Sequence, residues 1–188
     1  SLGAAFGWHL DAGSEFNPTE LCSGIFYLAK LNFGEINGDS PVGKAEKWRR
    51  AGIDIHRCIQ VVNDHLRIWM NREHLLRGGR RDVRLIEGIG LTNIIEVCAM
   101  LEWHPPGDFF KLFEDVVEKS GGSLLSQGGG KKRHVPSLLF AFGRLREQPS
   151  ERVLSHLIEF AKGVFVDLTA EEVRSDRVFH GLSLLGVY

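Results

Sequence analysis

The amino-acid sequence predicts an all-α protein. Apolar residues recur at helical spacing along most of the chain, and residues that can cap a helix precede several of these stretches. No stretch alternates apolar and polar residues for long enough to form a convincing strand. We expect a short α-solenoid of antiparallel helix pairs, in which neighbouring pairs bury each other's apolar faces. The alternative is an irregular helical bundle.

The first helix is expected over residues 17–33, NPTELCSGIFYLAKLNF. Asn17 can accept a backbone N–H bond as the N-cap, and Pro18 suits the first helical position because its missing N–H costs nothing there. Glu20 completes a capping box. Residues 34–43 hold Gly, Asn, Asp, Ser and Pro without periodicity, which predicts a loop.

Two helices are expected in the middle of the chain. The second covers residues 53–76 and carries an apolar stripe at helical spacing. The glycine-containing segment RGGRRDVR, residues 77–84, ends it. The third covers residues 90–103 and stops before Pro105, since the residue that precedes a proline disfavours helical geometry.

The remaining helices are expected over residues 108–120, 135–146 and 150–165, and a last one runs from Thr169 towards Leu185. Asp108 is a plausible cap for the first of these, and Thr169 forms a capping box with Glu172. Residues 121–134, GGSLLSQGGGKKRH, predict a flexible loop because of their glycines.

The apolar positions of several helices match at fixed offsets, which predicts a repeat. The first helices of the units match as follows: Leu21, Ile25, Leu28, Ala29 and Leu31 with Leu91, Ile95, Cys98, Ala99 and Leu101, and these with Val135, Leu139, Phe142, Gly143 and Leu145. The offset in residue number is 70 between Leu21 and Leu91, and it is 44 between Leu91 and Val135. In the second helices, the residues that match at the same offset of 44 are Phe109, Phe110, Phe113 and Val117 with Val153, Leu154, Leu157 and Ala161. A weaker fourth copy spans residues 178–186. Chance similarity between amphipathic helices is the alternative.

The segment FNPTELCSGIFYLAKLNF, residues 16–33, resembles the octotricopeptide and heptatricopeptide repeats of organellar proteins and the related repeats of the FAST-kinase/RAP-domain group. The matching residues are Phe16, Pro18, Glu20, Leu21, Leu28, Ala29 and Leu31, and LTAEEV at 168–173 echoes the same cap. The resemblance implies a protein located in the matrix of the mitochondrion or of another organelle. It also implies a role in RNA binding, RNA processing or editing, or ribosome assembly. A cytoplasmic location is the alternative.

Three basic clusters are the candidate nucleic-acid-binding residues: Arg77, Arg80, Arg81 and Arg84; Lys131, Lys132 and Arg133; and Lys47, Arg49 and Arg50. Arginine in a loose loop can contact RNA phosphates or stack on bases. The first two clusters precede equivalent helices of the repeat, so a solenoid would place them on one side. The alternative is a solvated surface.

The overall net charge of −1 gives no global basic signal for nucleic-acid binding. It favours the alternative function, a HEAT-like scaffold that binds partner proteins within a multisubunit complex.

We expect no enzymatic activity, cofactor, metal or small-molecule substrate. SQGGGKKR lacks the spacing of a phosphate-binding loop, and the eight histidines show no metal-ligand spacing. Cys22, Cys58 and Cys98 lie far apart inside apolar helical patterns. They therefore predict three buried, reduced thiols and a reducing compartment.

The sequence predicts a single helical repeat domain over residues 17–188. Residues 1–16, which include GSEF, are interpreted as a cloning remnant or as the end of a preceding element. No apolar run reaches the ~20 residues that a membrane span needs, so we expect no membrane partner.

Overall fold

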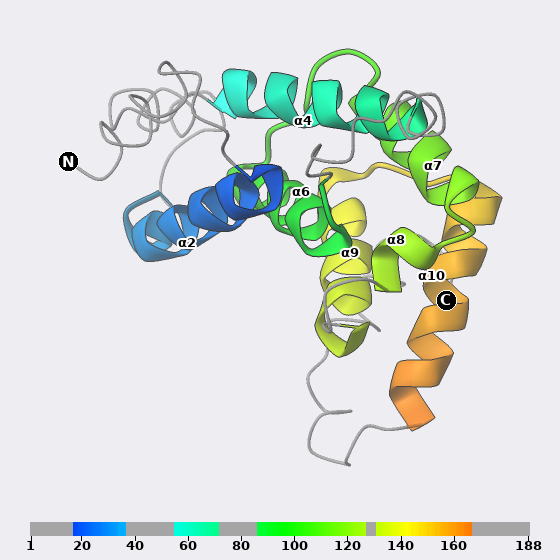
Figure 1. Cartoon of the computed structure of the whole chain (residues 1–188). Helices are drawn as coiled ribbons and strands as arrows, with labels where there is room; N and C mark the ends of the chain where they lie inside the picture. Colours follow the sequence, from blue (N-terminus) through cyan, green and yellow to red (C-terminus); the bar gives the residue numbers. More distant parts are fainter. Residues whose placement is uncertain (1–16, 37–54, 72–85, 127–130, 167–188) are drawn as a thin grey trace.

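The computed structural model describes residues 17–36, 55–71, 86–126 and 131–166, and these form seven helices without a strand among them (Figure 1). The helices are α2 (Pro18–Ile36), α4 (Ile55–Met70), α6 (Gly88–Leu101), α7 (Phe109–Lys119), α8 (Ser123–Ser126), α9 (Lys131–Leu145) and α10 (Glu151–Val166). The predicted all-α class is confirmed. The predicted helix after Thr169 and residues 1–16 lie outside the described residues.

The helices pack in two rows. In one row, α6 lies between α2 and α9; in the other, α7 lies between α4 and α10. Contacts of α2 with α4 and of α9 with α10 join the rows. In Figure 1, α4 crosses above α2 and α6, and α10 descends beside α9. Consecutive long helices therefore alternate between the two rows.

The core is continuous across both rows, and α6 is its most enclosed helix. Every residue from Leu91 to Ala99 is buried. Gly88 and Gly90 allow the backbones of α8 and α2 to lie close to the start of α6. A Cβ atom on Gly88 would lie 3.1 Å from the Cα of Leu125 and closer still to the carbonyl oxygen of Leu124. A Cβ on Gly90 would lie 3.0 Å from the Cα of Thr19.

Helices α6 and α9 end in the same way. The residues that follow them, Glu102 and Arg146, have positive φ values of 52° and 54°. Each N–H donates to the carbonyl three residues before it, and the next N–H donates to the carbonyl five residues before, which is a Schellman ending. The bonds are Glu102 N to Ala99 O (3.2 Å), Trp103 N to Cys98 O (3.0 Å), Arg146 N to Gly143 O (3.1 Å) and Glu147 N to Phe142 O (3.1 Å). The residues that form the bonds at the end of α9 have numbers 44 higher than those at the end of α6, which is the offset found in the apolar pattern.

The start of α2 is capped as predicted, because the Asn17 side chain accepts the Thr19 N–H at 3.0 Å. This helix continues to Ile36, three residues beyond the predicted end. Asp108 stands at the N-cap position of α7 but makes no capping bond. Its carboxylate instead lies 3.5 Å from the Arg67 guanidinium on α4.

The second predicted helix is shorter than expected, because α4 ends at Met70. The Asn71 side chain donates to the Arg67 carbonyl at 2.9 Å, and Lys119 Nζ donates to the Met70 carbonyl at 2.6 Å. The Arg67 carbonyl also accepts the Asn71 N–H at 3.2 Å, so Lys119 is the donor that satisfies a carbonyl which a longer helix would have bonded internally. A cation at this end is also favoured by the helix dipole.

The prediction of one flexible loop over residues 121–134 is wrong. Residues 123–126 form α8, and α9 begins at Lys131, four residues before the predicted start. Lysine and arginine have high helix propensity, so KKR extends the helix towards its N-terminus. Pro136 lies inside α9 near its N-terminal end, where the backbone loses one internal hydrogen bond.

Candidate functional site

Most of the predicted nucleic-acid-binding residues lie outside the described residues: Arg77, Arg80, Arg81, Arg84, Lys47, Arg49 and Arg50. The exceptions are Lys131, Lys132 and Arg133, whose backbone forms the first turn of α9. These three were expected in a loose loop, and this is corrected: their backbone is helical.

The part of the surface that the structure describes is more acidic than basic. Among residues whose side chains are described, eight are Lys or Arg and twelve are Asp or Glu. Four of the cations are paired with carboxylates: Arg67 with Asp64 and Asp108, Lys111 with Asp115, Arg144 with Glu102, and Arg152 with Glu118. This surface therefore does not have the basic character that binding along an RNA backbone requires.

Two glutamates of α7 fix the start of α10. The Ser150 N–H donates to Glu114 Oε1 at 2.7 Å, and the Ser150 hydroxyl donates to Glu118 Oε1 at 3.3 Å. The second oxygen of Glu118 accepts from Arg152 Nη1 at 3.3 Å. Carboxylates are stabilised beside a helix N-terminus by its unpaired N–H groups and its dipole. This explains why α10 begins against this face of α7.

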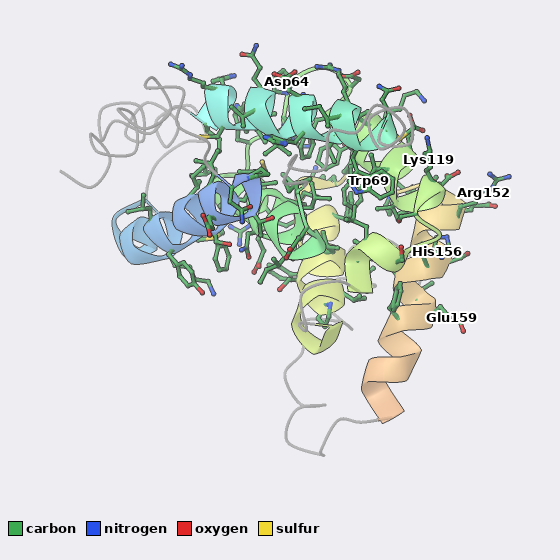
Figure 2. All side chains as sticks on the ribbon, in the orientation of Figure 1. Asp64, Trp69, Lys119, Arg152, His156 and Glu159 are labelled. Atoms are coloured by element: carbon green, nitrogen blue, oxygen red, sulfur yellow. The ribbon has the colours of Figure 1, made fainter. Side chains whose placement is uncertain are left out.

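An open pocket of about 400 Å³ lies where α7 ends and α10 begins. It is lined by Glu118, Glu151, Arg152, Ser155 and His156. Figure 2 shows Arg152, His156 and Glu159 in succession along α10.

The His156 ring lies against the turn that joins α7 to α8. A Cβ on Gly122 would approach its Nδ1 to 3.2 Å and the ring of Phe160 to 3.1 Å. Gly122 also has a φ of +75°, which favours glycine on its own account. One wall of the pocket is therefore an imidazole held in place by backbone.

Two exposed carboxylates of α10, one in the pocket lining and one beyond it, have no ion-pair partner among the described residues. Glu151, Ser155 and Glu159 are exposed and share one face of α10 at four-residue spacing. Neither Glu151 nor Glu159 forms an ion pair with the described residues, whereas Arg152 is paired with Glu118. The pocket consequently offers more negative than positive charge to a ligand.

The Ser155 hydroxyl of the pocket is bonded to the backbone. The Ser155 hydroxyl donates to the Glu151 carbonyl at 2.7 Å, as serine commonly does inside a helix, and no base among the described residues activates it. Within the described ranges, no group of three or more His, Cys, Asp or Glu side chains is placed to hold a metal ion.

The three cysteines meet in the core, although they are widely separated in sequence. Cys22, Cys58 and Cys98 come from α2, α4 and α6, and all are free and buried, which confirms the predicted buried thiols. Burial raises the pKa of Cys22 and of Cys98, and the other two cysteines raise that of Cys22 further. Such thiols are chemically inert because the thiolate is disfavoured.

Sequence reasoning did not single out the pocket. His156 is one of the eight histidines without metal-ligand spacing, and no pattern in the sequence connects it with Glu118. The nearest signal was the helix expected from residue 150, one residue before α10 begins at Glu151. The pairing of that start with α7 is a tertiary contact between segments that are distant in the chain.

Comparisons of this chain with protein-family models, with curated proteins and with solved structures found no match. None of the described helices combines the length and the apolar character that crossing a membrane would require.

Proposed function

We propose that this chain is a short α-solenoid that serves as a non-catalytic scaffold for partner proteins in a multisubunit complex. The units would follow the chain order, α2 with α4, α6 with α7, and α9 with α10, and direct packing within a unit joins α2 to α4 and α9 to α10. The observation that carries the proposal is the recurrence at an offset of 44, which appears in the apolar pattern and again in the hydrogen bonds that end α6 and α9.

The contacts within each row support the same arrangement. Each unit of a solenoid packs on its neighbours through equivalent helices, as α2, α6 and α9 do in one row and α4, α7 and α10 in the other. Asn93 Nδ2 donates to Ser23 Oγ at 3.0 Å, and the numbers of these two residues differ by 70, the offset of the first two units. Equivalent positions on α2 and α6 therefore face each other.

Charge favours a protein partner over RNA. The described surface holds eleven acidic and eight basic side chains, because Glu96 is buried, and Glu151 in the pocket has no ion-pair partner among the described residues. Such a surface repels phosphates and attracts basic segments of proteins.

Affinity purification of the tagged chain, with and without ribonuclease, tests the proposal. We expect at least one stoichiometric protein partner that survives ribonuclease, and chemical cross-links from it to α7 or α10. Loss of all partners on ribonuclease treatment would contradict the scaffold function.

A second candidate is organellar RNA binding through the basic clusters, and it is favoured by three successive cations in the first turn of α9. RNA affinity should then fall steeply as salt rises, because phosphate contacts release counterions. Reversing the charges of Arg80, Arg81, Lys131 and Lys132 together should abolish binding. Unchanged affinity would exclude these clusters, and imaging of the tagged full-length protein would test the mitochondrial location.

A further inference from the structure

We propose that the pocket between α7 and α10 receives an arginine side chain of the partner protein. This inference rests on the proposed scaffold function and names the chemistry that the partner presents. The pocket is lined by Glu118, Glu151, Arg152, Ser155 and His156.

The free acceptors of the pocket match a cation. Glu151 lines it and has no ion-pair partner among the described residues, and Glu159 follows two turns later on the same face of α10. A guanidinium group presents several N–H donors in one plane and can bond to a carboxylate through two of them.

An anion is disfavoured at this position. The cation that lines the pocket, Arg152, already lies 3.3 Å from Glu118, and its side chain is 82% exposed. The Ser150 N–H at the start of α10 is bonded to Glu114, and the Val153 N–H is bonded to the Ser150 hydroxyl at 3.4 Å. A phosphate or carboxylate would therefore meet two glutamates, one of which already offsets the charge of Arg152.

The size and walls of the pocket suit one long side chain. Its volume of about 400 Å³ is at the small end of ligand sites. The His156 ring, held against Gly122, gives a flat surface on which the methylene stem and the planar guanidinium can lie. Lysine lacks the planar group, so arginine is the better match.

Titration of the ¹⁵N-labelled full chain with Nα-acetyl-arginine amide, followed by NMR, tests this inference. We expect saturable, millimolar shifts confined to residues near 118–122 and 150–156. The lysine derivative should bind more weakly, and the norleucine derivative should give no saturable shift. Absence of saturation with arginine, or an equal response to all three, would overturn the inference.

A matched pair of variants removes one negative charge each. Glu151→Gln should weaken arginine binding by at least about threefold, because one charge-assisted contact is lost. Glu87→Gln alters an exposed glutamate at the start of α6 and should leave the affinity unchanged. Equal effects of both variants would mean that net charge, not the pocket, attracts the ligand, and would also overturn the inference.

The two proposals can fail separately. A ribonuclease-resistant partner that binds wild type and Glu151→Gln equally would overturn the arginine pocket and leave the scaffold intact. Loss of every protein partner would overturn the scaffold itself.

Discussion

Replacing Gly88 with alanine should destabilise the protein, although alanine is the better helix former. The new Cβ would lie 3.1 Å from the Leu125 Cα and closer to the Leu124 carbonyl oxygen. Both obstructing atoms belong to the backbone of α8, so no side-chain rotation relieves the contact. Overpacking of this kind costs about 1–3 kcal/mol, against a gain of less than about 1 kcal/mol from helix propensity.

The net loss is about 1–2 kcal/mol, which corresponds to a melting temperature lower by roughly 2–8 °C for a chain of this size. Urea unfolding followed by circular dichroism measures it, and hydrogen exchange should show weaker protection of the Leu124 and Leu125 amides. Gly107→Ala is the control. Gly107 has a φ of +74°, and a Cβ added there would have no neighbouring atom within 4 Å, so this substitution adds backbone strain without affecting α8. A Gly88→Ala variant as stable as the wild type would refute the packing of α8 on α6.

Three further predictions concern the core and its titrating groups. Phe113→Ala should lower the free energy of unfolding by about 3–5 kcal/mol, because the ring is fully buried against Phe142 and joins the two rows. The raised pKa values of Cys22 and Cys98 mean that only the unfolded chain ionises them above their ordinary value of 9.0. The contribution of these thiols to the free energy of unfolding is therefore fully present below pH 9. Above pH 9 the free energy of unfolding should fall by about 1.4 kcal/mol per pH unit for each thiol. Burial lowers the pKa of His65, and its neighbour Asp64 partly opposes this shift. The contribution of the neutral His65 to stability is therefore present above pH 6.5, and it is lost as the pH falls below that value.

Each of these predictions has a control. Phe110→Ala removes a partly buried ring of the same helix and should cost less than Phe113→Ala. Cys22→Ala should flatten the alkaline loss of stability, and His65→Gln should flatten the acidic loss. Rapid reaction of native Cys98 with a thiol reagent would contradict its burial, and an unchanged acid profile in His65→Gln would remove that residue as the cause.

The local signals in the sequence predicted helix starts better than helix ends. Asn17 caps α2 as its side-chain chemistry suggests, because the capping bond joins residues only two apart. The end of α4 was predicted six residues too late, and the Lys119 that bonds to the Met70 carbonyl there comes from a distant part of the chain. Asp108 was predicted to cap its own helix, yet its carboxylate lies beside Arg67 on α4.

The candidate site likewise depends on contacts between distant residues, which local signals in the sequence do not reveal. Its residues come from the end of α7 and the start of α10, and sequence alone gave them no common role. Glu118 became part of a pocket only because it accepts bonds from Ser150 and Arg152, which belong to a different segment of the chain. The basic clusters were visible in the sequence because their residues are neighbours in the chain.

By itself, the sequence determined the helical class and the recurring spacing of apolar positions, because both depend on periodicity within a few turns. Only the tertiary structure decided which helices pack side by side, that three distant cysteines share one core, and that a mixed-charge pocket forms where α10 meets α7. The physical reason is that these features depend on contacts between distant residues, whose free energy is gained only when the helices are already packed together.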